Sequence, residues 1–336
     1  MTNKPNYAFI DFIRSTSIFY IVGYLHLLNY TDIYPHYYNY FTYLLTLTAL
    51  GLLFFISGYL IGIKQVEFNV QNILCFVGRR FIRIYPPFLV AVFLFYFLEI
   101  IDRSSAIRVA LLITPFLSPV PKTLWFIPVI FFYYLIAPIF YSYALKRWQF
   151  LLLTISLISV LTLYSFYTNW LDKRVILYLP SFLVGLFVGK NSLAISNVTI
   201  WKLLPILPIA LFIGFITDSG LNLSNYLMSP FVTILTLVIF ILTSKTIENN
   251  ISSIISSIVK KLSYASYFMY LSHRPIYTTL LNIWTPVSQF RKFLYLVLVC
   301  LPSIVVVSWI LQRTYDLVCE KLHFSRIMLI FDENKL

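Results

Sequence analysis

The sequence has 336 residues, of which 60% are hydrophobic and only 11% are charged, and its mean hydropathy is +0.84. This composition excludes a water-soluble globular protein of this length and predicts a membrane protein. The net charge of +13 comes from 25 lysines and arginines scattered between apolar segments, so it does not indicate a nucleic-acid-binding surface.

Apolar runs along the chain predict an all-α bundle of about ten membrane spans. We expect one transmembrane domain over residues 1–336 with no separate soluble domain. The stretch 105–120 is too short and too rich in proline to span, so we expect a short helix or re-entrant piece there rather than an eleventh span. The predicted spans are residues 8–30, 40–64, 82–101, 123–145, 149–168, 174–190, 200–217, 227–245, 262–285 and 291–318.

The connections between these spans differ in positive charge. Sixteen lysines and arginines fall on one side, eight fall on the other, and Arg14 lies within a span. Because cytoplasmic loops carry the excess of positive charge, both termini are predicted to be cytoplasmic.

The first predicted span carries three ionisable side chains, Asp11, Arg14 and His26. Each such group costs about 2.5–3.5 kcal/mol in a bilayer, so a plain anchor would not be expected to keep them. The spacing of Asp11 and Arg14 allows a local ion pair, and a structural pair near the inner interface is one interpretation of Arg14. For His26 the alternative to a functional role is a hydrogen-bonded interior histidine.

The second span ends in FFISGYLIGIK, residues 54–64. Its small residues, Ser57, Gly58 and Gly62, would let a neighbouring helix approach closely. Taken alone, this segment predicts helix packing.

Three arginines follow at the inner membrane face in GRRFIRIYPP, residues 78–87, which stops at two prolines. Guanidinium groups at positions such as Arg80 and Arg83, with Arg79 beside them, suit a phosphate group because each can donate parallel hydrogen bonds. The positive-inside rule or contact with anionic lipid headgroups would explain the same charges.

Polar and aromatic residues mark the predicted outer side. Trp125 begins the fourth span, where an interfacial tryptophan is common. In the ninth span, Ser266 and Tyr270 precede His273 and Arg274 near the outer end. Such a polar helix end could line an acceptor site or anchor the helix at the interface.

Together, these motifs resemble those of the membrane-bound acyltransferase-3 family. Members of that family carry an I-D-x-x-R start with a downstream histidine, then FFxxSGyLi, RRxxRIxP, LWF-x-P, ylPxFlxGxxxG and SYxxYLxH. In this sequence the motifs stand in the same order at Ile10–Arg14 with His26, Phe54–Ile61, Arg79–Pro86, Leu124–Pro128, Tyr178–Gly189 and Ser266–His273.

The resemblance implies a multi-pass O-acyltransferase of the bacterial cytoplasmic membrane. Such an enzyme moves an acyl group, commonly acetyl, from cytoplasmic acyl-CoA to a hydroxyl of a surface or lipid-linked glycan. Its partners are therefore acyl-CoA, the saccharide acceptor and membrane lipids, and neither a metal nor a nucleic acid is expected. Some members carry an extracellular hydrolase-like domain that finishes the transfer. We expect no such domain in this sequence, so the membrane core would complete the transfer alone or pass the acyl group to a partner protein.

The resemblance also implies roles for the first span and the arginines. His26 would act as a general base or form an acyl-histidine, and Arg14 would orient the thioester or stabilise negative charge. Asp11 would hold Arg14 in place. The CoA phosphates would bind Arg79, Arg80 and Arg83, and the acceptor site would include Trp125, Ser266, Tyr270 and His273.

One spacing departs from the family pattern. The family has ten residues between the arginine and the histidine of the first helix, whereas eleven separate Arg14 from His26. On a regular helix the two side chains would then lie about 120° apart. A single-residue π-bulge between Ser15 and Leu25, near Gly23, would restore their alignment.

A transporter or flippase for a glycan or lipid-linked precursor is the alternative from another functional class. It would also explain charged groups within the membrane. The RRxxRIxP cluster beside the histidine-bearing first span favours the enzyme, because export requires no CoA site.

Overall fold

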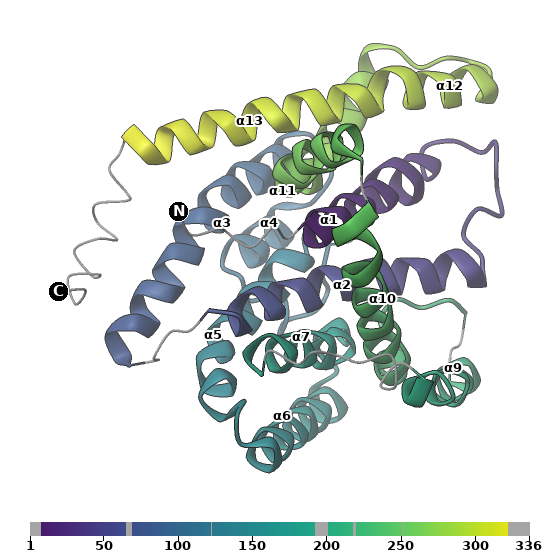
Figure 1. Ribbon diagram of the computed structural model, residues 1–336. Coiled ribbons are helices and arrows are strands. Elements are labelled where there is room, and N and C mark those ends of the chain that lie inside the picture. Colours follow the sequence, from purple (N-terminus) through teal and green to yellow (C-terminus); the bar gives the residue numbers. More distant parts are fainter. Residues whose placement is uncertain are drawn as a thin grey trace.

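The computed structural model describes residues 8–64, 69–121, 123–191, 201–217, 220–250 and 252–321. Within these ranges every regular element is a helix, which confirms the predicted all-α fold (Figure 1). The elements are α1 (Ala8–Tyr20), the π-helix η1 (Ile21–His26), α2 (Tyr40–Gly62), α3 (Val70–Phe97), α4 (Arg103–Ala110), α5 (Phe126–Tyr143), α6 (Arg147–Thr168), α7 (Arg174–Lys190), α9 (Ile206–Ile216), the 3₁₀ turn η2 (Tyr226–Met228), α10 (Ser229–Asn250), α11 (Ser253–Ile283), α12 (Gln289–Tyr295), the π-helix η3 (Leu296–Cys300) and α13 (Leu301–Lys321).

Each predicted span coincides with a helix, although the helices differ in length and polarity. Seven helical segments among the described residues are long and apolar enough to cross a membrane. The remaining predicted spans fall on the 17-residue α7, on α9 and on the more polar α11. Residues 105–120 hold only the end of the short helix α4, as expected. The exact number of spans stays a prediction, as does the cytoplasmic location of the termini, which lie outside the described residues.

Helix α3 begins earlier than the hydrophobic pattern predicts. It starts at Val70 instead of residue 82, because the Asn69 side chain caps it by accepting a hydrogen bond from the backbone N–H of Asn72 at 2.8 Å. The arginine cluster therefore lies within the helix and not ahead of it.

The arginine-bearing helix continues through two prolines. Pro86 and Pro87 lie inside α3, which continues to Phe97. Proline has no N–H, so Pro86 leaves the carbonyl of Ile82 without its helical donor. The hydroxyl of Tyr315 on α13 donates a hydrogen bond to that carbonyl, so a neighbouring helix satisfies it.

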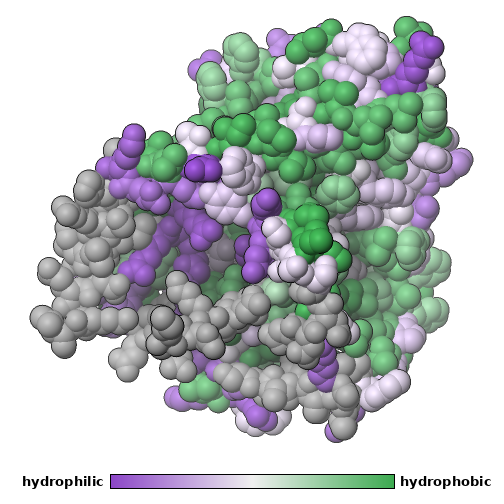
Figure 2. Space-filling model, turned by 45° about the horizontal axis from the view of Figure 1, so that its top comes forward, coloured by the Kyte–Doolittle hydropathy of each residue, from purple (hydrophilic) through white to green (hydrophobic). Residues whose placement is uncertain are grey.

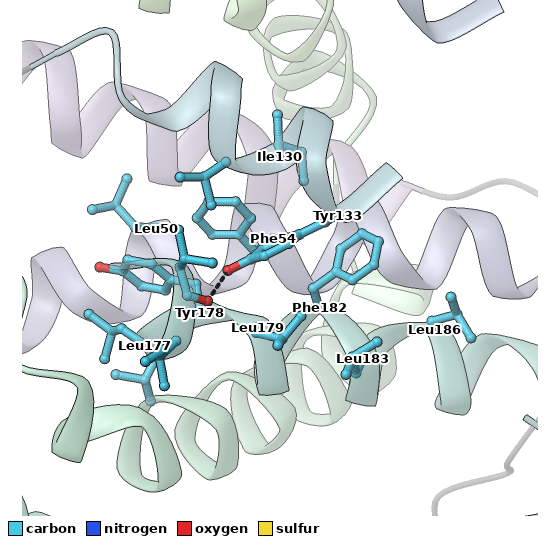
Figure 3. Packing of buried hydrophobic residues seen from close by; sticks show 14 of the residues in the cluster. Leu50, Phe54, Ile130, Tyr133, Leu177, Tyr178, Leu179, Phe182, Leu183 and Leu186 are labelled. Atoms are coloured by element: carbon cyan, nitrogen blue, oxygen red, sulfur yellow. Dashed lines mark hydrogen bonds between the residues drawn. The ribbon is translucent and has the colours of Figure 1, made fainter. Parts of the chain in front are cut away.

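The glycines of α2 and α7 form the closest helix contact, as their small size predicts. A Cβ added at Gly58 would lie 2.0 Å from the carbonyl oxygen of Phe182, and one at Gly185 would lie 2.1 Å from that of Phe55. Aromatic and aliphatic side chains from α2, α5 and α7 pack around this contact (Figure 3). The predicted packing role of the small residues is confirmed.

Helix α1 lies inside the bundle, where it packs against α2, α10 and α11 (Figure 1). Its ionisable residues Asp11, Arg14 and His26 are accordingly all partly buried. In contrast, α6 has many exposed apolar side chains, among them Leu152 and Phe166. Figure 2 shows one face of the molecule, where hydrophobic side chains predominate and hydrophilic side chains gather in one area. This distribution fits a bundle that faces lipid.

Candidate functional site

The first helix contains the predicted π-bulge. Regular α-helix gives way to a π-helix over Ile21–His26, which includes Gly23. A π-bulge absorbs one residue, so the twelve residue steps from Arg14 to His26 rotate the chain about the helix axis as much as about eleven regular α-helical steps would. That rotation is about 1100°, which differs from three whole turns by about 20°. Arg14 and His26 therefore share one side of the helix. The hydroxyl of Tyr277 on α11 donates a hydrogen bond to the Val22 carbonyl within the π-helix at 3.2 Å.

His26 pairs with a second histidine from the far end of the sequence. Its Nδ1 lies 2.6 Å from Nε2 of His273 on α11, 247 positions away. The ring planes are 18° from parallel, with centroids 4.7 Å apart. His273 is fully buried, so it does not form part of an exposed helix end.

The hydrogen bonds of His273 fix the direction of the histidine pair. Its Nδ1 lies 2.8 Å from the Tyr270 carbonyl oxygen and 3.1 Å from that of Met269. Because carbonyl oxygens only accept, this Nδ1 must carry the proton. With both rings neutral, Nε2 of His273 then accepts from the Nδ1–H of His26. The lone pair of His26 is left on Nε2, where it can accept a proton or attack a carbonyl carbon.

Asp11 bonds to a different partner from the one that its spacing suggests. Its Oδ1 accepts a hydrogen bond of 2.6 Å from the Ser263 hydroxyl on α11. Among the residues that the structure describes, no ion pair joins Asp11 to Arg14, although the charge of Asp11 acts on Arg14. That Asp11 holds Arg14 in place stays a prediction. Asp11 ties the start of α1 to α11.

Basic side chains of α1 and α3 lie near one another. The Arg80 guanidinium lies over the rings of Phe76 and Tyr134, with distances to the centroids of 4.0 and 5.0 Å. Arg14 lies close enough to Arg83 for their charges to interact. The predicted arginines thus come together with the arginine of the first span.

Lys64 is a further member of this basic cluster, which we define as Arg14, Lys64, Arg79, Arg80 and Arg83. Partial burial lowers the pKa of Lys64, and the positive charges of Arg80, Arg79 and Arg83 lower it further. Since like charges repel, an anion bound here would be favoured. Sequence reasoning missed Lys64, although it directly follows the small-residue segment of α2.

Trp125 is buried, not exposed at the membrane interface. Its side chain is 5% exposed, stacks on Tyr178 with centroids 5.8 Å apart, and lies 4.4 Å beneath the Arg174 guanidinium. Arg174 in turn donates to Asp172 at 2.8 Å. The interpretation of Trp125 as an ordinary interfacial residue of the aromatic belt is therefore wrong.

Ser266 and Tyr270 also lie inside the bundle. The Ser266 hydroxyl donates to the Ser263 carbonyl at 2.7 Å, and the Tyr270 hydroxyl donates to the Thr123 carbonyl. Because both side chains are buried, they do not anchor the helix at the interface. Their predicted contact with an acceptor stays a prediction.

A cavity of about 520 Å³ lies beside η1. Residues of η1, of the connection from η1 to α2 and of the α12–η3 region line it, among them Gly23, Tyr24, Tyr34, His36, Tyr37 and Phe293. None of the residues predicted for the acceptor site lines it. No group of three or more His, Cys, Asp or Glu side chains among the described residues could hold a metal ion.

One of the comparisons with known proteins identifies a family for this chain. A family model described as an acyltransferase domain matches residues 7–313, nearly the whole chain. No curated protein and no solved structure matches the chain. The matched range includes the histidine pair, the basic cluster and the π-helix, and the apolar helices place these groups in a membrane bundle. The chain therefore belongs to the acyltransferase-3 family and is a membrane acyltransferase.

Proposed function

We propose that this acyltransferase transfers an acetyl group from cytoplasmic acetyl-CoA to a hydroxyl of a surface or lipid-linked glycan in the bacterial cytoplasmic membrane. The observation that carries the proposal is the hydrogen bond between His26 and His273. It directs the free lone pair of His26 to Nε2 and holds the ring by a partner that is itself fixed to backbone carbonyls.

The chemistry needs one base at the reacting centre. Nε2 of His26 takes the proton of the acceptor hydroxyl as its oxygen attacks the thioester carbonyl. The C–S bond then breaks, and the leaving thiolate takes the proton from the imidazolium. In the alternative route the same nitrogen attacks the thioester and the C–S bond breaks, which gives an acyl-histidine and the CoA thiolate. The acceptor hydroxyl then attacks the acyl carbon, the C–N bond to His26 breaks, and the proton of the hydroxyl passes to the thiolate. His273 positions the ring in both routes.

The basic cluster fits the donor. Arg79, Arg80, Arg83 and Lys64 supply the positive charge that the phosphates of CoA require at the predicted cytoplasmic side. Arg14 adds to this charge from the first helix.

Arg14 and His26 are well separated along their helix. Eleven regular steps correspond to about 17 Å of axial rise, so the Arg14 side chain cannot reach a carbonyl beside His26 Nε2. This separation supports a role for Arg14 in orienting the donor rather than in stabilising charge at the reacting carbonyl. The long pantetheine arm of CoA would follow the shared side of the helix from Arg14 to His26.

The acceptor would approach from the end of the bundle that lies opposite the basic cluster. The acceptor residues proposed from sequence are Trp125, Ser266, Tyr270 and His273. Trp125 lies directly before α5, and the other three lie on α11. Their burial supports a role in shaping the reacting centre more than one in binding an extended glycan.

Membranes that contain the protein, incubated with labelled acetyl-CoA, test the proposal. Label should enter a glycan fraction, and His26→Ala and Arg83→Ala should each abolish incorporation while the protein stays in the membrane. Lys260→Ala, which removes an exposed lysine of α11, is the matched control and should keep activity. Glycan transport without incorporation would instead support the transporter alternative.

A further inference from the structure

Arg274 is a partly buried cation that the acyl transfer described above does not use. It follows His273 directly on α11. Its Nε atom is buried and has no hydrogen-bond partner among the described residues. Nor does any carboxylate in the described part of the chain form an ion pair with it. A buried Nε–H donor normally has an acceptor, because leaving a donor of a charged group unsatisfied is unfavourable.

Arg274 lies within electrostatic reach of two groups of side chains. Its charge acts on His26 and His273 of the histidine pair. It also acts on Tyr30 and Tyr37 in the connection between η1 and α2. A molecule that approaches His26 from this connection would therefore pass within electrostatic reach of Arg274.

Tyr37 also belongs to the wall of the 520 Å³ cavity beside η1. Its hydroxyl donates to Oδ1 of Asn29 at 3.2 Å, and its side chain lies within electrostatic reach of Arg274. The volume falls within the range of small-molecule sites, and the wall combines aromatic rings with a few polar groups. Such a wall suits a sugar ring, which has both apolar C–H faces and hydroxyl groups.

We propose that Arg274 binds an oxyanion group of the acceptor, a carboxylate or a phosphate, so that the acceptor is an anionic saccharide and not a neutral one. The guanidinium offers parallel donors that match either group. The bound anion would supply the counter-charge that the described part of the chain does not provide at this position. This inference rests on the proposed function, because it describes the acceptor of that reaction.

Binding to the full-length protein in neutral-lipid nanodiscs tests the inference without any acyl transfer. The probes are methyl glucuronoside, its neutral counterpart methyl glucoside, and glucose 6-phosphate. The wild type should bind the glucuronoside or the phosphate at least about tenfold more tightly than the glucoside. Which of the two anionic probes binds better tells a carboxylate acceptor from a phosphate acceptor.

Arg274→Gln should remove this preference and leave the weak binding of methyl glucoside unchanged. Arg274→Lys keeps the charge without the parallel donors, so it should retain part of the preference even where the glutamine variant folds poorly. Arg103→Gln removes an exposed arginine at the start of α4 and is the matched control. Equal binding of all three probes by the wild type would overturn the inference, as would an undiminished preference in Arg274→Gln.

The same measurement in nanodiscs with phosphatidylglycerol examines a lipid headgroup as the source of the anion. The inference predicts that the preference for the anionic saccharide survives, and its loss in these nanodiscs would assign Arg274 to lipid. The activity assay separates the two proposals. Absence of any acyl transfer contradicts the proposed function, whereas equal transfer to neutral and anionic acceptors contradicts only the role of Arg274.

Discussion

Nδ1 of His26 lies 2.6 Å from Nε2 of His273, so a hydrogen bond joins the last turn of the first helix to α11. The second histidine donates through its own Nδ1 to the carbonyls of Met269 and Tyr270. This chain of bonds sets the tautomer of His26 and aims its free nitrogen away from the pair. A residue that sequence reasoning assigned to the acceptor site thus contacts the proposed catalytic base directly.

Replacing His273 should affect catalysis more than donor binding. His273→Ala removes the acceptor for the Nδ1–H of His26, so kcat should fall about 100-fold while KM for acetyl-CoA changes little. His273→Gln offers a side-chain oxygen as an acceptor and should recover part of the rate. Steady-state kinetics of the purified variants measures both effects. If alanine and glutamine reduce kcat equally, the proposed hydrogen-bonding role is wrong.

The basic cluster should discriminate donors by their phosphates. Arg83→Gln should raise KM for acetyl-CoA about tenfold, since a hydrogen bond to a charged group contributes about 1.5 kcal/mol or more. KM for acetyl-pantetheine, which lacks the phosphates, should not change. Lys261→Gln on α11 provides the matched control for the loss of one positive charge. An equal rise of KM for both donors would show that Arg83 does not bind phosphate.

Ser263 should stabilise the bundle through Asp11. Ser263→Ala leaves the partly buried carboxylate without its 2.6 Å donor, so the free energy of unfolding should fall by about 1–3 kcal/mol. Ser303→Ala is the control, because that hydroxyl only bonds to the Val299 carbonyl of its own helix turn. Its effect should stay within about 0.5 kcal/mol. Thermal unfolding in detergent compares the two, and equal shifts would contradict the role of Asp11 as a tether.

The glycine contact between α2 and α7 should tolerate no side chain. Gly58→Ala would place its Cβ 2.0 Å from a backbone oxygen of α7, so we expect a destabilisation of at least about 3 kcal/mol. Gly78→Ala in α3 meets no atom within 4 Å and should stabilise the protein by about 0.5–1 kcal/mol. Opposite shifts of the unfolding temperature are expected in detergent. Similar temperatures for both variants would show that the helices can separate at this contact.

Features that depend on local pattern could be predicted from the sequence. The apolar runs predict the helices, and Gly58 and Gly62 predict a close helix contact that the structure confirms. The π-helix was predicted because one residue more separates Arg14 from His26 than in the family pattern. These predictions succeed because helical period and residue size act over a few turns.

Features that depend on tertiary pairing were not accessible in this way. The partners of Asp11 and His26 lie 252 and 247 positions away, so no spacing rule indicates them. Trp125 has the character of an interfacial residue, yet Arg174 and Tyr178 cover it. The start of α3 was missed because Gln71, Asn72 and the arginine cluster depress the hydropathy of this stretch, although Asn69 provides a capping signal.

The most direct test of the account is transmembrane acetyl transfer by proteoliposomes of defined orientation. Labelled acetyl-CoA is supplied only on the side of the basic cluster, and a saccharide acceptor only on the side of the His26 end of the first helix. We expect labelled acceptor with the wild-type protein. We expect no labelled acceptor with His26→Ala, or with the wild-type protein when acetyl-CoA is supplied only on the acceptor side. Labelling by His26→Ala at the wild-type rate would contradict the account.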